Sequence, residues 1–115
     1  MKPEQFIREY GVEKARDLLD QLHKLGCPDD MKITVINGMW QRTSNGFTYP
    51  ELKRLVESVD RVNEHGGYLA AKELLSFLIV HQGAFGKSAV SDETINSLKA
   101  AIRDHESIYG GSHES

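Results

Sequence analysis

The sequence is poor in the residues that build covalently linked or metal-held scaffolds. It contains a single cysteine, Cys27, among 115 residues, so no disulfide can form within the chain. A lone cysteine is typical of a protein that folds through its apolar core in a reducing compartment. At this length a chain can bury such a core as one domain. We therefore predict a single domain over residues 1–109, followed by a flexible tail over residues 110–115.

Charge of one sign is also scarce. Lysine and arginine total 14 against 17 aspartates and glutamates, which leaves a formal net charge of −3. This near balance excludes a strongly basic nucleic-acid coat protein and a strongly acidic mimic of DNA. The residues that follow Met1 have no apolar segment of the kind found in signal peptides. We expect a cytoplasmic protein.

Long hydrophobic runs are missing as well. The most apolar stretch, residues 68–81, is shorter than the roughly 20 residues that a membrane-spanning helix needs. Before His81, only Lys72, Glu73 and Ser76 interrupt its apolar character. A helix that is apolar nearly all round normally lies in the middle of a domain, with neighbours on several sides. We predict that residues 68–81 form a central buried helix and that the protein does not act in a membrane.

Motifs for catalysis and for metal binding are lacking too. His23 and Cys27 stand four residues apart, but no second pair at the spacing of a zinc site accompanies them. Residues 86–88 read Gly-Lys-Ser, as phosphate-binding loops end, yet His81 stands where that motif needs its first glycine. We predict no enzymatic activity, no metal and no cofactor. The alternative is a hydrolase or transferase that uses Cys27 or a histidine.

What the sequence does have is a strong helical periodicity, which predicts a mainly helical α+β fold of about five helices. Two glycines punctuate it, Gly26 before Pro28 as a helix stop and Gly11 as a break. Thr48 and Glu51 have the spacing of a capping box, and Ser91 suits a helix N-cap. The helical segments are residues 3–25 in two pieces, a helix that begins at residues 48–51 and ends before Gly66, residues 68–81, and a last helix from Ser91.

A short pattern occurs twice, 56 residues apart. Gly11-x-x-x-Ala15-Arg-Asp-Leu-Leu-x-x-Leu22 matches Gly67-x-x-x-Ala71-Lys-Glu-Leu-Leu-x-x-Leu78. One explanation is a duplicated glycine–helix unit. The other is that two amphipathic helices that follow glycine turns have converged on one pattern.

Residues 32–49 change character and predict one β-hairpin or a short three-stranded meander. Lys32-Ile33-Thr34-Val35-Ile36 is rich in β-branched residues and is followed by Asn37-Gly38. Asn-Gly between two such runs is a strong hairpin signal, because both turn positions need a positive φ.

The hairpin region is also the best candidate for a binding surface. It holds the only tryptophan, Trp40, and residues 32–54 carry four basic side chains against one acidic one. Aromatic side chains beside arginine suit a protein hot spot or the stacking of bases, although Trp40 can instead pack into the core. The predicted contacts for a protein partner are Met39, Trp40, Arg42, Phe47 and Tyr49. The predicted contacts for a nucleic acid are Lys32, Arg42, Lys53 and Arg54.

Two segments carry a resemblance to a known group of proteins. Residues 1–19, which begin Met1-Lys2-Pro3-Glu4-Gln5-Phe6, and residues 52–60, Leu-Lys-Arg-Leu-Val-Glu-Ser-Val-Asp, resemble small accessory or early-region proteins of lambda-like temperate phages and prophages of enterobacteria. The resemblance implies expression in the cytoplasm of a bacterial host cell and a dispensable, host-directed role. It brings no catalytic motif and transfers no functional residues.

Taken together, these patterns predict a non-enzymatic phage protein, monomer or homodimer, that binds and modulates a host or phage protein. Inhibition of a bacterial defence system, as anti-CRISPR proteins do, is one concrete form. The alternative is a small nucleic-acid-binding regulator that uses the basic, aromatic hairpin.

Overall fold

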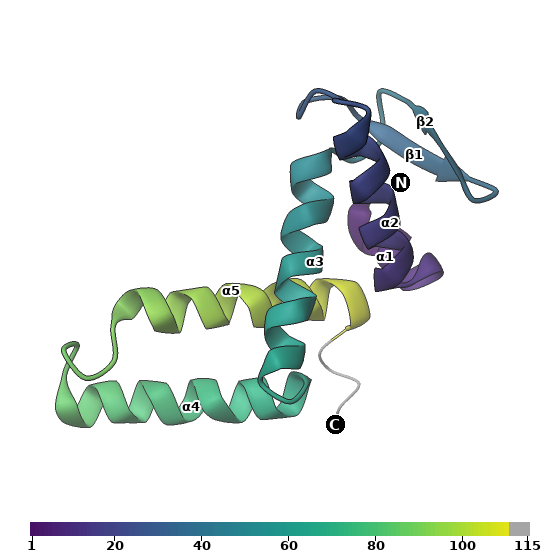
Figure 1. Ribbon diagram of the computed structural model, residues 1–115. Helices are drawn as coiled ribbons and strands as arrows, with labels where there is room; N and C mark the ends of the chain where they lie inside the picture. The colour runs from purple at the N-terminus through teal and green to yellow at the C-terminus, as the bar shows by residue number, and fades with distance from the viewer. Residues whose placement is uncertain (111–115) are drawn as a thin grey trace. The chain divides into compact units, whose positions relative to one another are not determined.

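A computed structural model describes residues 1–110 and confirms the mainly helical α+β fold (Figure 1). Five α-helices and one two-stranded sheet make up this part of the chain. The predicted tail lies outside the described residues, except for Gly110. The elements in order are α1 (Pro3–Tyr10), α2 (Val12–Lys24), β1 (Ile33–Ile36), β2 (Met39–Arg42), α3 (Tyr49–Glu64), α4 (Tyr68–Phe85) and α5 (Asp92–Tyr109).

The contacts of the chain group it into two compact units. The first unit covers Met1–Val56 and the second begins at Glu57. Helix α3 contributes its first half to one unit and its second half to the other. The single domain expected over residues 1–109 stays a prediction, and each unit is described by itself.

The first unit packs α1, α2 and the hairpin around an apolar core. Helices α1 and α2 are separated at Gly11, which has φ 91° and ψ 160°. Phe6 of α1 and Phe47 are both buried, and their ring centroids lie 5.8 Å apart. Leu22 of α2 and Ile33 of β1 are also almost fully buried. The core of this unit therefore draws on helices and strands that are far apart in the sequence.

The hairpin has the turn that its sequence predicts. Strands β1 and β2 are antiparallel, with Val35 opposite Trp40 and Ile36 opposite Met39. Asn37 and Gly38 both have positive φ, 54° and 82°, as a two-residue hairpin turn requires. No third strand forms in the described chain, because beyond β2 only Phe47 pairs with β1, through a single bridge to Ile33. Of the two alternatives predicted for residues 32–49, the two-stranded hairpin is the one observed.

The predicted helix ends are confirmed by their hydrogen bonds. Gly26 has φ 67°, and the Cys27 N–H donates to the Leu22 carbonyl at 3.2 Å, which closes α2 with a Schellman motif. At the start of α3, the Thr48 N–H donates to Glu51 Oε1 at 2.9 Å, and the Glu51 N–H donates back to Thr48 Oγ1 at 3.4 Å. Ser91 caps α5 by accepting from the Thr94 N–H at 3.2 Å.

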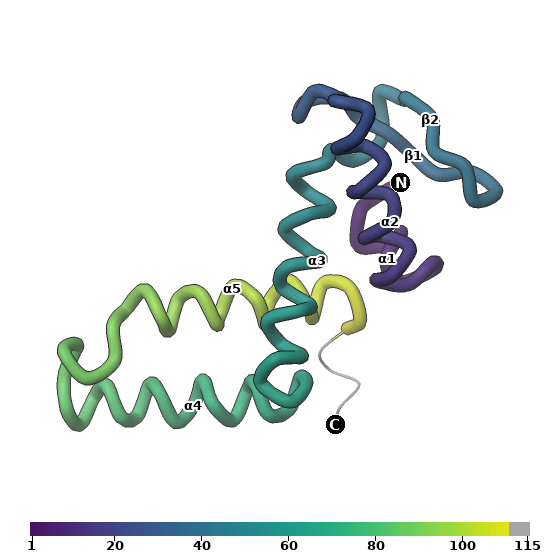
Figure 2. Tube along the Cα trace, in the orientation of Figure 1, coloured from purple at the N-terminus to yellow at the C-terminus, as the bar shows by residue number. Residues whose placement is uncertain are grey.

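In the second unit, α4 and α5 lie side by side and are joined by a tight reversal after Phe85, which the trace in Figure 2 follows. Val62, Ala71, Leu98, Ala101 and Ile102 form the core, and Tyr68, Leu74, Leu75 and Leu78 pack against it. Polar contacts reinforce this packing. Ser58 Oγ donates to the buried Asp104 carboxylate at 2.7 Å, and the Tyr68 hydroxyl donates to Glu106.

The helix predicted over residues 68–81 requires two corrections. It extends to Phe85, four residues beyond the predicted end at residue 81. More importantly, Ala71 is its only buried residue, so α4 is not the buried centre of the fold. The physical reason is the number of neighbours. A helix that is apolar all round needs partners on several sides, and in its own unit α4 packs mainly against α5.

Candidate functional site

The predicted protein-contact residues do not all reach the surface. Met39 is 75% exposed, and Arg42 is exposed on the same strand. Trp40 and Tyr49 are half-buried. Phe47 is only 1% exposed. The prediction for Phe47 is therefore corrected: its ring packs on Phe6 in the core and cannot contact a partner.

The alternation of the two strands explains this distribution. Side chains of directly paired residues point to the same face of a hairpin. Val35 and Trp40 form such a pair on the face toward α2, where Val35 is buried. Ile36 and Met39 form the next pair, at the turn, and lie on the opposite face with 52% and 75% exposure. This exposed aliphatic pair is the apolar surface that the hairpin offers.

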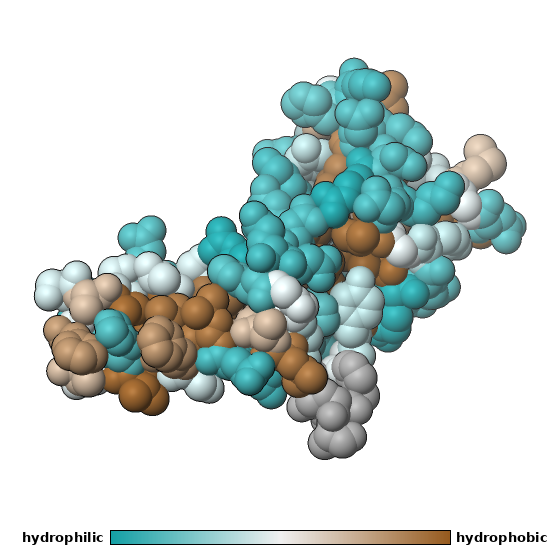
Figure 3. All heavy atoms as spheres, turned by 60° about the horizontal axis from the view of Figure 1, so that its bottom comes forward, coloured by the Kyte–Doolittle hydropathy of each residue, from teal (hydrophilic) through white to brown (hydrophobic). Residues whose placement is uncertain are grey.

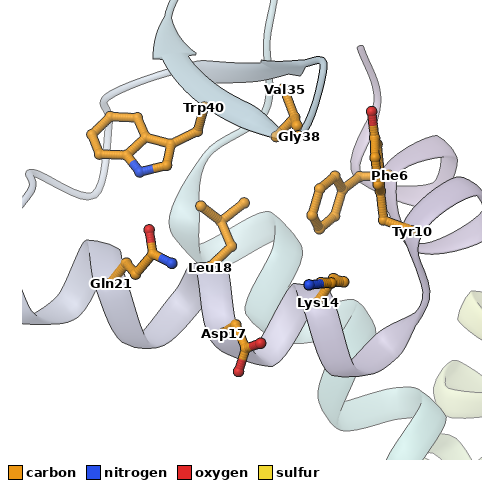
Figure 4. Close-up of a pocket in the computed structure, with 9 residues that line it drawn as sticks. All are labelled: Phe6, Tyr10, Lys14, Asp17, Leu18, Gln21, Val35, Gly38 and Trp40. Carbon is orange, nitrogen blue, oxygen red and sulfur yellow. The ribbon is translucent and has the colours of Figure 1, made fainter.

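Trp40 closes one end of a cavity of about 180 Å³ between the hairpin and the first two helices (Figure 4). In Figure 4 the indole lies above Gln21 of α2, while Phe6 and Tyr10 of α1 stand at the other end. The remaining lining residues are Lys14, Asp17, Leu18, Val35 and Gly38. The sequence did not decide whether Trp40 lies in the core or on the surface. In the structure Trp40 is half-buried, and its ring lines the cavity instead of packing in the core.

The predicted nucleic-acid contacts lie in the same unit. Lys32 and Arg42 line one groove, together with Pro28, Asp30, Met31, Thr43 and Ser44. They come together because Thr43, next to Arg42, donates its N–H to the Lys32 carbonyl at 3.0 Å. Lys53 and Arg54 are exposed on α3. The acidic Asp30 in the same groove reduces its positive charge.

A second exposed surface, on α4, was not predicted as a site. Five large apolar side chains of this helix are open to solvent: Leu69 (59%), Phe77 (59%), Ile79 (45%), Val80 (72%) and Phe85 (67%). The space-filling view in Figure 3 shows apolar side chains gathered along this part of the second unit. A contiguous exposed apolar patch marks an interaction surface. The sequence already contained a signal for this exposed surface. The segment is apolar on every side, and the chain has few other elements that could cover it.

The ionisable contacts of the second unit are structural in character. The hydrogen bond from Tyr68 to Glu106 raises the pKa of the Tyr68 phenol. Lys87 Nζ lies 2.9 Å from Asp92 Oδ2, and this contact, helped by a hydrogen bond from Gln82, lowers the pKa of Asp92. Gln82 also donates to the Val90 carbonyl at 2.9 Å, so these side chains tie the end of α4 to the start of α5.

Within residues 1–110, no group of three or more histidine, cysteine, aspartate or glutamate side chains is placed to hold a metal ion. Cys27 is half-buried and His23 is exposed. In the same range, no helix combines the length and apolar character needed to cross a membrane. On residues 1–110, the candidate binding surfaces are therefore two groups of exposed apolar side chains. One group is Ile36 with Met39 on the hairpin, and the other is on α4.

Comparison with known proteins assigns the chain to no family. No protein-family model matches the chain, and no curated protein or solved structure gives a significant match.

Proposed function

We propose that the protein is a non-enzymatic, phage-encoded interaction protein that binds and modulates a host or phage protein through its hairpin. An inhibitor of a bacterial defence system is the most specific form of this proposal. The observation that carries the proposal is the exposed pair of Ile36 and Met39 at the turn. Apolar side chains held on a short, hydrogen-bonded hairpin bind a partner at low cost in conformational entropy.

Trp40 and Arg42 lie on the same strand as Met39 but on the other face of the hairpin, because side chains alternate along β2. Arginine and tryptophan are enriched among the residues that dominate binding energy in protein interfaces. Arg42 is exposed and Trp40 is half-buried against its cavity, so a partner that grips the hairpin from both faces can contact them as well as Ile36 and Met39. Phe47 has no part in this surface, and Tyr49 lies at the first turn of α3.

The test is affinity capture of the whole protein's partners from a lysate of an enterobacterial host. The double variant Ile36→Ser/Met39→Ser should lose the captured partner while it keeps its helical circular dichroism, because both side chains are already largely exposed. Leu25→Ser is the matched control, since Leu25 is 65% exposed in the same unit but lies at the end of α2. Equal recovery with the double variant and the wild type would refute the hairpin as the binding surface.

A second candidate, a small nucleic-acid-binding regulator, is favoured by the groove that holds both Lys32 and Arg42. Binding should then weaken steeply with added salt, because each phosphate contact releases counterions. The double variant Lys32→Ala/Arg42→Ala should flatten that dependence, while Lys99→Ala on α5 should not. A gel shift that is absent even at low salt would exclude this candidate.

A further inference from the structure

The cavity beside Trp40 has the size of a binding site for a small molecule. All of its lining residues belong to the first unit, Met1–Val56, so the whole cavity lies within that unit. Its volume is about 180 Å³. An apolar protein cavity of roughly 150 Å³ takes up one benzene molecule. The space beside Trp40 therefore fits a single aromatic ring.

Aromatic side chains form both ends of the cavity. In Figure 4 the Trp40 indole stands at one end, and the Phe6 and Tyr10 rings stand at the other. The Phe6 ring is fixed by two neighbours, with its centroid 5.1 Å from that of Tyr10 and 5.8 Å from that of Phe47. Trp40 is held by its pairing with Val35 in the hairpin. Aromatic rings attract one another at centroid distances of about 4.5–7 Å, so fixed rings at both ends favour an aromatic ligand.

The middle of the cavity is apolar. Leu18 of α2 and Val35 of β1 line it, and these side chains are 5% and 7% exposed. Neither side chain has an atom that can form a hydrogen bond. Apolar cavities stay dry or hold water poorly, so a ring that enters displaces no well-bound water. Contact with the walls is therefore not offset by the loss of hydrogen bonds to water.

Two polar groups at the Trp40 end are not used by the fold. Among residues 1–110, neither the indole N–H of Trp40 nor the side-chain amide of Gln21 makes a hydrogen bond to the protein. Figure 4 shows the Gln21 amide below the indole, at the edge of the cavity. An indole N–H donates, and an amide both donates and accepts. Together they suit one hydroxyl group, which accepts from the indole and donates to the amide oxygen.

The formal charges around the cavity are balanced. Lys14 and Asp17 are both exposed and lie three positions apart on α2. Of the residues that line the cavity, only these two carry a formal charge. A charged ligand would meet one opposite and one like charge, so the charges give it no net attraction. The site therefore favours a neutral ligand.

We propose that this cavity binds a small neutral phenol. The ring lies between Trp40 and Phe6, and the hydroxyl lies between the indole N–H and the Gln21 amide. This site is separate from the proposed contact of Ile36 and Met39, which lie on the opposite face of the hairpin. A ligand of about seven non-hydrogen atoms makes few contacts, so the dissociation constant is expected to be on the order of 1 mM.

The experiment is a titration of the full chain with phenol, followed by the fluorescence of Trp40, the only tryptophan of the chain. Phenol should change the fluorescence to a plateau, because its ring comes to lie against the indole in a single site. Benzoate, which adds a negative charge to the same ring, should bind more weakly. Benzoate that binds more tightly than phenol would overturn the choice of a neutral ligand.

The position of the hydroxyl is tested by Gln21→Leu, with toluene as a ligand of the same size that lacks the hydroxyl. The variant should weaken phenol roughly two- to tenfold, the loss expected for one hydrogen bond, and should not weaken toluene. Gln21 is exposed, so the variant is expected to fold. Gln41→Leu is the matched control, because Gln41 is exposed on β2 and does not line the cavity.

The cavity itself is tested by Val35→Phe, whose larger side chain fills the space that the ligand would take. Binding of phenol and of toluene should be abolished while the helical circular dichroism is retained. If this variant does not fold, Gln21→Leu decides alone. The proposal is overturned by a fluorescence change that never saturates, by phenol binding that survives in folded Val35→Phe, or by equal effects of Gln21→Leu and Gln41→Leu. None of these results affects capture of a partner through Ile36 and Met39.

Discussion

Helices α2 and α4 begin in the same way and end in different surroundings. Gly11 and Gly67 precede them with φ 91° and 108°, and each glycine carbonyl accepts from the alanine four residues on, at 3.2 Å and 2.9 Å. Ala15 and Ala71 are both fully buried. Further along, Leu18 and Leu22 of α2 are buried, whereas their counterparts in α4 are only half-buried.

The faces that point away from the core differ even more. In α2 they carry Glu13, Asp17 and Asp20, all exposed, while α4 shows Leu69, Phe77 and Val80. The repeated pattern therefore determines how each helix starts and where its alanine packs. It does not determine how much of the helix is covered, because that depends on the elements around it. Duplication and convergence both remain compatible with this pair of helices.

The largest expected effect is a difference in stability between matching leucine variants of α2 and α4. Leu22→Ala should lower the free energy of unfolding by about 2–5 kcal/mol, because it removes a side chain that is 2% exposed and leaves a cavity. Leu78→Ala, at the matching position of α4, should cost clearly less, since Leu78 is only half-buried. Urea unfolding at low protein concentration measures both. Equal losses would contradict the difference in burial on which the comparison rests.

The buried alanines should respond alike. Ala15→Leu and Ala71→Leu should each destabilise the protein by about 1–3 kcal/mol, because a larger side chain must displace packed neighbours. Both alanines are 0% exposed. Thermal unfolding gives the two values side by side. A tolerated Ala71→Leu beside a damaging Ala15→Leu would show that the α4–α5 contact is looser than the contact made by α2.

Substitution of Gly11 and Gly67 tests whether α2 and α4 start with the same backbone geometry. Gly11 and Gly67 occupy a backbone region that is open essentially to glycine alone, so substitution by alanine should cost about 1–3 kcal/mol at each. An added Cβ would meet no atom within 4 Å at either position, so the cost comes from the backbone itself. Chemical denaturation of both variants gives the values.

Gly83 is the control for this pair. It lies inside α4, and an added Cβ there also meets nothing within 4 Å. Gly83→Ala should therefore stabilise the protein by about 0.5–1 kcal/mol, the usual difference between these residues within a helix. A neutral Gly67→Ala would show that α4 does not start with the geometry of α2.

The smallest effect concerns how the two helices end. Backbone hydrogen bonds around Gly26 close α2, whereas the end of α4 is tied by Lys87, Gln82 and Asp92. The pKa of Asp92 is lowered from its usual 3.8 by the Lys87 contact and then by Gln82. Its stabilising contribution is therefore present above the pKa of the unfolded chain and is lost as the pH falls through the lower pKa of the folded state.

Asp92→Asn should flatten the fall in stability below about pH 4, the usual range of aspartate titration, and Lys87→Ala should do the same in part. Urea unfolding at a series of pH values measures the effect. The effect is small because the carboxylate is exposed and screened by solvent. An unchanged pH profile in both variants would mean that the contact between Lys87 and Asp92 does not stabilise the connection between α4 and α5.

Local chemistry explains what could be predicted from the sequence. The turn at Asn37-Gly38, the capping box of Thr48 and Glu51, and the cap at Ser91 each depend on residues within a few positions of one another. Such short-range patterns specify their own hydrogen bonds, so they were found without knowledge of the fold. The five helices follow from the same kind of signal.

Burial could not be predicted in the same way, because it depends on partners that are distant in the sequence. Phe47 looked like a surface aromatic on the hairpin, yet its neighbour in space is Phe6, 41 positions earlier. The apolar segment over residues 68–81 looked like a core helix, although its own unit lacks the elements to enclose it. The candidate contacts Met39, Trp40 and Arg42 remain accessible or partly so, and they are the part of the predicted site that the fold retains.

The exposure of Met39 also has a consequence for sulfur chemistry. Met1 and Met31 are half-buried, while the thioether of Met39 stands open to solvent beside Ile36. Oxidants convert such a side chain into a polar sulfoxide, and dedicated reductases reverse the change. In preparations that have aged in air, Met39 is thus expected to be oxidised before Met1 and Met31, and the methionine sulfoxide reductases that reverse the change would restore the thioether.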